Sequence, residues 1–384
     1  MKNIIIIGSR GYNYDYGGWE TLVSNLIDNY KDDDVRFFVP ELSYKMNNEI
    51  EIRNGVICKQ VFIPKHGPLA MFSFVFKSVL YYTNLIRKEK MKNTIIYMLG
   101  FRGGFLFKLI HRKLNKMEVK VITNPGYIKS KIENKPWIVK YLTRKSEKEM
   151  IKYSDIVLCD SKLSENYIKD KYNVHTKYIP CGTNIPDTKD IDKKTRIFME
   201  KKNIRKREYY LVIGRFIPKN NIDLIIKEFM LSDTDKDLVI VSDITKNKYY
   251  DKLLKSTNFN KDKRIKFVGP IYDKDIITRL RVNSKGYIYG HKEGGINPSL
   301  IESLSTSDVN IVYDNEYNRE VCKDSCLYFT DEAFNLRDII DKVDRFKSKE
   351  YEEYSSKAKE RVKEEYDLNT IIKKYKKLFD TLLK

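Results

Sequence analysis

The sequence has 384 residues, 41% of them hydrophobic, with 28 Tyr and 18 Phe, which excludes a disordered chain and is enough for two domains. It carries 73 Lys and Arg against 53 Asp and Glu, a formal net charge of +20. Such an excess suits an anionic partner. No zinc-finger, basic heptad or aromatic RNA-binding signature accompanies it, so phosphorylated ligands or an acidic membrane surface are favoured over nucleic acid.

The cysteines and the apolar segments narrow the class further. The five cysteines form no CxxC pair and have no His neighbours to complete a metal set, so we expect reduced structural thiols in a cytosolic protein. The first residues run straight into a glycine turn and do not form a secretory signal. Residues 69–86 approach the length of a membrane span, but Lys77 lies in their middle, which favours a buried or interfacial helix.

The first half begins with a strand and a long glycine loop. Residues 4–7 are a β-branched run typical of a strand buried in a parallel sheet. A loop ending in Gly17 and Gly18 leads to a predicted helix over 19–30. The dinucleotide fingerprint GxGxxG is absent, so the loop is predicted to cradle a phosphate, the alternative being a merely flexible connection.

Strands and helices then alternate, which predicts a doubly wound α/β domain. The predicted strands are 35–39, 56–63, 94–99, 119–123 and 156–159, and the predicted helices are 72–86, 105–114, 137–152 and 164–172.

The pattern restarts after a breaker-rich segment at 178–187 and a charged helix near 193–203. A strand over 209–214 is followed by Arg215 and a helix over 222–230, and further strands are predicted at 238–242, 265–268, 286–289, 309–312 and 326–329. Residues 351–384 read as one or two helices with an apolar stripe. The sequence therefore predicts two doubly wound, Rossmann-like domains.

Residues 286–304 combine a strand, a glycine loop and a helix start. Asn297, Pro298 and Ser299 signal the helix N-terminus, where backbone donors and the helix dipole favour an anion. Glu302 lies about one turn into that helix, where its carboxylate could accept hydrogen bonds from sugar hydroxyls. The alternative is an ordinary βα unit with a solvated Glu.

The motifs GSRGYNYDYGGWET, YYLVIGRFIPKNNIDLIIKEF and GHKEGGINPSLIES occur in this order. In this order they resemble the GT-B glycosyltransferases of family 4, closest to the bacterial rhamnosyltransferase-type enzymes of capsular and cell-wall polysaccharide synthesis. The resemblance implies two domains facing a central cleft. Residues 1–185 would bind the acceptor, with a C-terminal helix of about 366–384 returning to them, and residues 186–365 would bind the nucleotide sugar.

The resemblance also implies site residues. Gly17 and Gly18 match the loop whose N–H groups approach the donor diphosphate, Arg215 matches the basic residue that pairs with it, and Glu302 matches the ribose ligand. The loop with Gly294, Gly295, Asn297 and Ser299 would face the donor sugar and phosphates. His291 would contact the donor, the alternative being a role in loop packing.

Three departures from the family pattern stand out. The usual Lys five residues after the Arg is Asn220 here, with Lys219 one place earlier as the expected diphosphate ligand. The usual Glu eight residues before the second Glu is Gly294, with Glu293 one place off as its candidate replacement. Residues 124–131 do not carry the Asp-Gly-x-Glu-Trp type of segment.

The expected reaction moves rhamnose or a related hexose from a nucleotide-diphosphate donor to a hydroxyl of a polyprenyl-diphosphate-linked glycan, with retention implied by the resemblance. dTDP-rhamnose is the favoured donor and a UDP-sugar the other. No cofactor and no metal are expected, because Arg215 and Lys219 would stabilise the leaving group. The protein would be cytoplasmic and peripheral at the anionic inner face of the membrane. A GT-B-like sugar-nucleotide epimerase, a nicotinamide-dependent oxidoreductase and a nucleic-acid-binding protein are the alternatives.

Overall fold

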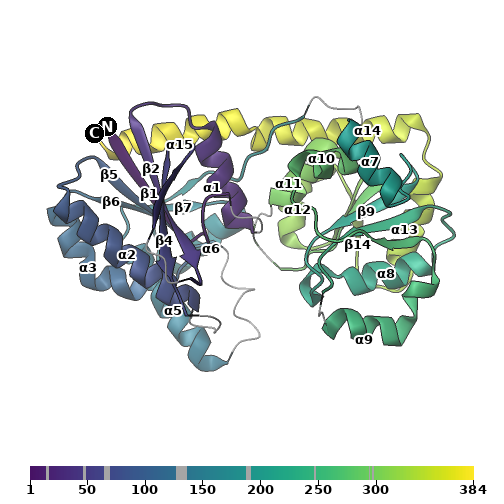
Figure 1. Ribbon diagram of the computed structural model, residues 1–384, viewed down its shortest axis with the longest axis horizontal. Helices are drawn as coiled ribbons and strands as arrows, with labels where there is room; N and C mark the ends of the chain where they lie inside the picture. The colour runs from purple at the N-terminus through teal and green to yellow at the C-terminus, as the bar shows by residue number, and fades with distance from the viewer. Residues whose placement is uncertain are drawn as a thin grey trace. The chain divides into compact units, whose positions relative to one another are not determined.

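A computed structural model describes residues 1–13, 17–45, 49–64, 70–126, 136–186, 192–245, 248–293, 295 and 298–384. The chain forms two compact units (Figure 1). Unit 1 comprises Met1–Gly182, Gly295–Pro298 and Leu368–Lys384, and unit 2 comprises Thr183–Gly294 and Ser299–Asp367. The domain boundaries predicted from the sequence lie at 185/186 and at 365/366.

Unit 1 is built on a largely parallel sheet with the strand order β3-β4-β2-β1-β5-β6-β7-β8. Its strands are β1 (Lys2–Ile7), β2 (Val35–Ser43), β3 (Ile50–Arg53), β4 (Val56–Phe62), β5 (Thr94–Leu99), β6 (Lys120–Asn124), β7 (Ile156–Cys159) and β8 (Thr176–Tyr178). The central strand β1 pairs in parallel with β2 and β5, and β3 is antiparallel to β4. The β-branched run of β1 is fully buried because helices cover both faces of the sheet.

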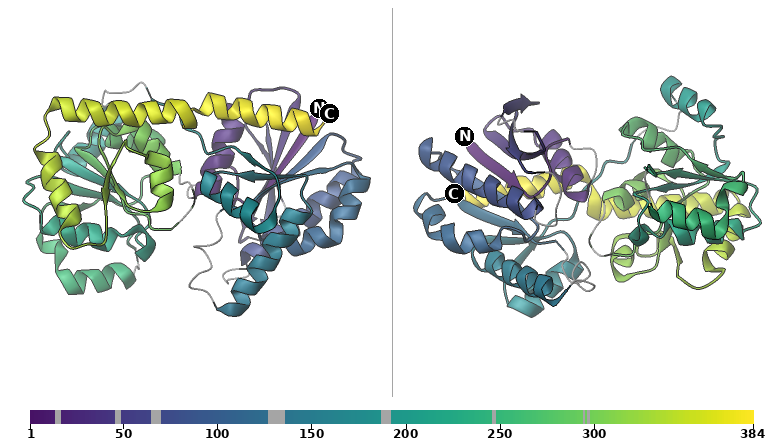
Figure 2. Two further views of the ribbon diagram at one scale, coloured as in Figure 1. Left: turned by 180° about the vertical axis from the view of Figure 1, so that it is seen from behind. Right: turned by 60° about the horizontal axis from the view of Figure 1, so that its bottom comes forward.

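Two groups of helices cover this sheet (Figure 2). The helices are α1 (Gly18–Asn29), α2 (Ala70–Lys88), α3 (Gly104–Lys116), α5 (Trp137–Lys152), α6 (Lys162–Tyr172) and α15 (Leu368–Leu382). α2, α3 and α5 share one apolar core with β1, β2, β4, β5 and β6. α15, the C-terminal helix, lies beside α1, and Lys2 pairs with Asp380 at 2.6 Å, so both chain ends belong to unit 1.

Unit 2 contains a parallel sheet with the order β11-β10-β9-β12-β13-β14. Its strands are β9 (Tyr209–Ile213), β10 (Asp237–Val241), β11 (Ile265–Phe267), β12 (Gly286–Tyr289), β13 (Asn310–Tyr313) and β14 (Leu327–Phe329). Its helices are α7 (Lys193–Lys201), α8 (Ile222–Met230), α9 (Lys248–Thr257), α10 (Lys274–Val282), α11 (Pro298–Thr306), α12 (Glu316–Cys322), α13 (Asn335–Asp344) and α14 (Ser348–Arg361). The doubly wound α/β architecture predicted from the sequence is therefore confirmed in both units.

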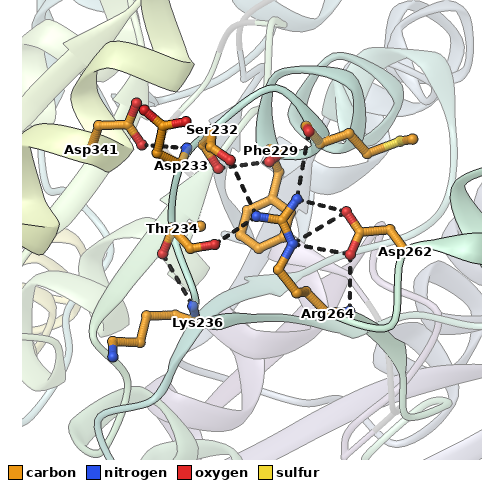
Figure 3. A network of polar contacts seen from close by, with 9 residues as sticks. Phe229, Ser232, Asp233, Thr234, Lys236, Asp262, Arg264 and Asp341 are labelled. Carbon is orange, nitrogen blue, oxygen red and sulfur yellow. Dashed lines mark hydrogen bonds and ion pairs between the residues drawn. The ribbon is translucent and has the colours of Figure 1, made fainter.

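Arg264 forms a network of polar contacts at the amino-terminal end of the unit 2 sheet (Figure 3). Arg264 donates to Asp262 through Nε at 3.0 Å and Nη2 at 2.7 Å, and through Nη1 to the carbonyls of Ser232 at 3.2 Å and Thr234 at 2.6 Å. Its guanidinium also lies 5.0 Å from the ring centroid of Phe229. One side chain thus ties the segment after α8 to the start of β11.

The apolar segment at 69–86 becomes the core helix α2. Phe74, Val75, Val79 and Tyr82 are buried in the unit 1 core, in agreement with the prediction of a buried helix. Among the described residues, no helix is both long and apolar enough to cross a bilayer.

Candidate functional site

Two loops meet at the carboxyl end of the unit 2 sheet. β9 and β12 are parallel neighbours, so the segments that follow them, beginning at Gly214 and at Gly290, emerge at the same edge. Lys292 N donates to the carbonyl of Lys219 at 2.9 Å, which holds the loops together. A Cβ on Gly290 would lie 2.4 Å from the carbonyl oxygen of Asn220, so only glycine permits this approach.

Asn220 organises the first of these loops. Its Nδ2 donates to the carbonyl of Arg215 at 2.7 Å, and its Oδ1 lies 2.8 Å from Nδ1 of His291. With the amide in this orientation, Oδ1 accepts and His291 donates from Nδ1, which places the lone pair of a neutral ring on Nε2. Asn220 therefore bonds as donor and as acceptor, whereas a Lys at this position could donate to the carbonyl but could not accept from His291.

The cations of this edge differ in their partners. Lys219 Nζ pairs with Glu293 Oε2 at 3.3 Å. Arg215 is exposed and forms no ion pair with the part of the chain that the structure describes. An exposed guanidinium on the same loop as a lysine is suited to a diphosphate, because Arg presents a planar fork of donors to phosphate oxygens.

Glu302 is held by an arginine that the sequence analysis did not identify. Arg281, at the end of α10, donates through Nη1 to Glu302 Oε2 at 2.8 Å and through Nη2 to Ser299 Oγ at 2.8 Å. The hydroxyl of Tyr287 lies 3.3 Å from the same Ser299 Oγ. Ser299 and Glu302 therefore form one cluster at the start of α11.

The electrostatics of this cluster favour a fixed carboxylate. The Arg281 side chain is 4% exposed and that of Glu302 is 32% exposed. Burial opposes the charge of Arg281, but Glu302 and Tyr287 more than compensate and raise the pKa of Arg281 above its ordinary value. Glu302 is thus anchored from the inside while part of its side chain reaches solvent, which suits a carboxylate that accepts hydrogen bonds from ligand hydroxyls.

In unit 1, Gly17 and Gly18 stand at the start of α1. Gly17 has a φ of 146°, and a Cβ there would lie 1.9 Å from Glu20 Oε2, so the position requires glycine. The buried Glu20 accepts from Arg10 N at 2.8 Å through Oε1. The glycine pair therefore opens the N-terminus of α1, while Glu20 ties it to the loop after β1.

A second arginine reaches the same edge of unit 1. β1 and β5 are parallel neighbours, and Arg10 and Arg102 follow their carboxyl ends. Burial, and next the charge of Arg10, lower the pKa of Arg102, while Glu20 opposes this shift. Arg10 and Arg102 therefore place two cations near the carboxyl ends of β1 and β5.

Gly294 and Asn297 lie outside the described residues, and Gly295 has a φ of 106°. No group of three His, Cys, Asp or Glu side chains that could hold a metal ion is found within the described ranges. The structure brings Arg215, Lys219, His291 and Glu293 together at one edge of unit 2 and joins Ser299 to Glu302 in the neighbouring cluster.

Family models match both halves of the chain. Residues 1–184 match a domain of unknown function (DUF1972), and residues 194–365 match the family described as glycosyl transferases group 1. A curated relative, an uncharacterized glycosyltransferase of Methanocaldococcus jannaschii, is 23% identical over 403 residues, and the match covers 100% of this chain and 100% of the relative.

Solved structures share the fold over the whole chain. Sucrose-phosphate synthase from Thermosynechococcus elongatus has a TM-score of 0.81 at 15% identity, and a glycosyltransferase from Rickettsia africae has 0.74 at 15% identity, each covering 100% of this chain and 99% of the other. A trehalose-6-phosphate structure from E. coli bound with UDP-2-fluoro glucose has 0.74 at 8% identity, covering 99% of both chains. The group 1 match, the curated relative and the shared fold together support a glycosyltransferase with the GT-B architecture.

Proposed function

We propose that the protein transfers rhamnose or a related hexose from a nucleotide-diphosphate donor to a hydroxyl of a lipid-linked glycan, as the family 4 and rhamnosyltransferase-type motifs suggest. The observation that carries the donor assignment is the edge of unit 2, where exposed Arg215 and Lys219 share the loop after β9 and the Arg281–Ser299–Glu302 cluster offers an anchored carboxylate. Diphosphate charge and ribose hydroxyls are the two features that such a pair of groups recognises.

The reaction breaks the bond between the anomeric carbon and the diphosphate oxygen. The acceptor oxygen bonds to that carbon and loses its proton, and the nucleoside diphosphate leaves with the bonding electron pair. Negative charge therefore grows on the diphosphate, where fixed cations contribute most to the rate. In this proposal Arg215 and Lys219 carry that role without a metal, and the configuration at the anomeric carbon is retained.

The remaining donor contacts follow from the family resemblance. Glu302 would accept from the ribose, and backbone N–H groups of Gly17 and Gly18 would approach the diphosphate. Ser299, together with Gly294, Gly295 and Asn297, would face the sugar and phosphates. His291 and Glu293 would contact the donor from the loop after β12, where His291 is oriented by Asn220.

The acceptor is proposed to be anionic and membrane-bound. A polyprenyl diphosphate carries negative charge, and Arg10 and Arg102 place positive charge at the carboxyl edge of the unit 1 sheet. Residues 1–185 with the C-terminal helix would then bind the acceptor, and residues 186–365 the donor.

A thermal-shift screen of dTDP-, UDP- and GDP-sugars tests the donor class, because a ligand far above its dissociation constant stabilises the fold by a few kcal/mol. dTDP-rhamnose is expected to give the largest shift, with a UDP-sugar as the other candidate. Incubating the best donor without acceptor provides the control: an epimerase would convert the sugar, whereas a transferase would leave it or hydrolyse it slowly. Conversion to an epimer, or no shift with any nucleotide sugar, would overturn the proposal.

A further inference from the structure

Exposed apolar side chains gather on three helices of unit 1. Of the seventeen large hydrophobic side chains that are exposed in the described part of the chain, nine lie on α2, α3 and α5. Scattered single residues of this kind are normal on a protein surface, but a concentration is typical of an interaction site.

The three helices form one continuous layer over the sheet (Figures 1 and 2). α3 meets α5 closely at Gly104, where a Cβ would lie 1.8 Å from the carbonyl oxygen of Ser146. On its other side, the position of a Cβ on Gly103 lies 3.5 Å from a methyl group of Val75 in α2. The apolar residues on the outer side of these helices therefore belong to one surface.

The exposed apolar residues of α2 and of α3 share one helix face each, whereas those of α5 surround its first two turns, since Trp137, Ile138 and Val139 are consecutive. The exposed residues form four i,i+4 pairs, and partners at this spacing lie side by side on a helix. The pairs are Phe76 with Leu80, Phe105 with Leu109, Trp137 with Tyr141, and Ile138 with Leu142. Trp137 and Leu109 are each 76% exposed, so nothing within the described chain covers them.

The same helices are strongly basic. Together they carry twelve Lys and Arg side chains and two Glu. One of the two, Glu147, is fully buried and accepts from Lys171 at 3.1 Å and from Tyr172 at 2.8 Å, so it does not offset the outer charge. The surface made by the outer sides of α2, α3 and α5, called here the basic apolar face, is therefore apolar and cationic at once.

We propose that the basic apolar face docks on an anionic lipid bilayer. Lysine is depleted in protein–protein interfaces, whereas Lys and Arg interleaved with Trp, Phe and Leu are the combination that binds a headgroup region. The cations pair with lipid phosphates, and Trp137 and Tyr141 lie at the boundary with the acyl chains. This inference rests on the proposed membrane-bound acceptor. It identifies the outer sides of α2, α3 and α5 as the protein surface that contacts the membrane.

The test is vesicle flotation of the full chain at low salt, with phosphatidylcholine vesicles that contain or lack phosphatidylglycerol. Wild type is expected to bind only the anionic vesicles. Replacing exposed Arg144, Lys145 and Lys148 of α5 with Glu is expected to weaken binding about a hundredfold or more. The matched control reverses Lys227, Lys252 and Lys255, which are exposed on α8 and α9 of unit 2, and is expected to bind as wild type does.

A second variant tests the apolar part. Trp137→Ser with Leu142→Ser is expected to lower binding at least tenfold, whereas Ile197→Ser with Leu231→Ser, two exposed positions in unit 2, is expected to change nothing. The chain has two tryptophans, so Trp19→Phe leaves Trp137 as the only one, and its emission is expected to shift to the blue on anionic vesicles.

Three results would overturn the proposal: no binding by wild type, equal loss in the α5 and control variants, or vesicle binding that survives both α5 variants. If the α5 variants instead convert a dimer into a monomer with vesicle binding intact, the face joins two copies of the chain. Sugar transfer to a detergent-dispersed acceptor is measured in parallel. Transfer without vesicle binding refutes the docking face alone, and vesicle binding without transfer to any acceptor refutes the proposed function alone.

Discussion

Arg281 and Glu302 form an ion pair in which the arginine is buried and the glutamate reaches solvent. Nη1 of Arg281 lies 2.8 Å from Oε2 of Glu302, and the arginine has 4% of its side chain exposed against 32% for the glutamate. The arginine also donates to Ser299 Oγ at 2.8 Å. A planar fork thus fixes two groups of α11 at once, so Arg281 is a positioning residue for Glu302.

Arg281→Lys should weaken donor binding about tenfold, because a lysine keeps the charge but cannot hold two oxygens in fixed geometry. The measurement is the dissociation constant of the nucleoside diphosphate by calorimetry, together with the melting temperature. A purely structural role would lower the melting temperature and affect all ligands equally.

A ligand comparison separates these roles. If Arg281 acts through Glu302 on the ribose, its substitution should cost affinity for nucleotides with ribose hydroxyls and almost none for a dideoxyribose analogue. The same loss with both ligands would refute the positioning role. Glu302→Gln provides the matched variant, and combining it with Arg281→Lys should add less than the sum of the single effects.

The sequence predicted those parts of the fold that have strong local signals. The fully β-branched run of β1 and the apolar runs of β5 and β9 identify buried strands without any tertiary information. The edge strands β3 and β8 were missed, because none of their residues is buried and their pairing comes from a neighbour. The helices α9, α10, α12 and α13, which have seven to ten residues and many charged side chains, were not predicted either.

Some residues of the candidate site could be identified from the sequence, and others only from the tertiary fold. Arg215 follows Gly214, Lys219 follows Pro218 and Glu302 lies four residues after Pro298, so all three could be selected from the motifs. Arg281 could not, because it lies 21 residues before Glu302 on a helix without a motif, and only the tertiary fold buries it against α11. The roles of Asn220 likewise depend on the meeting of two loops.

Arg215→Ala should lower turnover with any sugar nucleotide roughly tenfold or more, the scale of a lost charge-stabilising contact. Its side chain is exposed and forms no ion pair among the described residues, so the melting temperature should stay the same. Lys227→Ala, at an exposed position in α8, is the control for loss of one positive charge. Turnover close to wild type in Arg215→Ala would remove this residue from the diphosphate site.

Stability at acid pH should depend on Asp262. Hydrogen bonding to Arg264 lowers the pKa of this carboxyl below its ordinary 3.8, while burial opposes the shift. A carboxyl with a lowered pKa in the folded state contributes stability above its unfolded pKa, and that contribution disappears as the pH falls through the folded value. Asp262→Asn should therefore cost roughly 1–3 kcal/mol at neutral pH, and its difference from wild type should shrink below about pH 4.

Urea denaturation at neutral pH and near pH 3 measures this difference, since the midpoint reports stability when the slope is unchanged. Asp251→Asn, at an exposed position in α9, is the matched control and should alter neither midpoint. A gap between Asp262→Asn and wild type that stays constant at both pH values would show that the charge on Asp262 does not contribute.

Lys219 and Glu293 should respond in opposite directions to substitution. Their ion pair, 3.3 Å long with side chains 33% and 41% exposed, is of the surface type that contributes little to stability. If Lys219 binds the donor diphosphate, Glu293 competes for it. Lys219→Ala should then weaken nucleoside-diphosphate binding about tenfold, whereas Glu293→Gln should maintain or strengthen it.

Calorimetry with the diphosphate and with the nucleoside alone checks this, because the nucleoside should bind both variants as it binds wild type. Weaker diphosphate binding in Glu293→Gln would instead make Glu293 a donor ligand in its own right, the role that its place next to Gly294 suggested from the sequence.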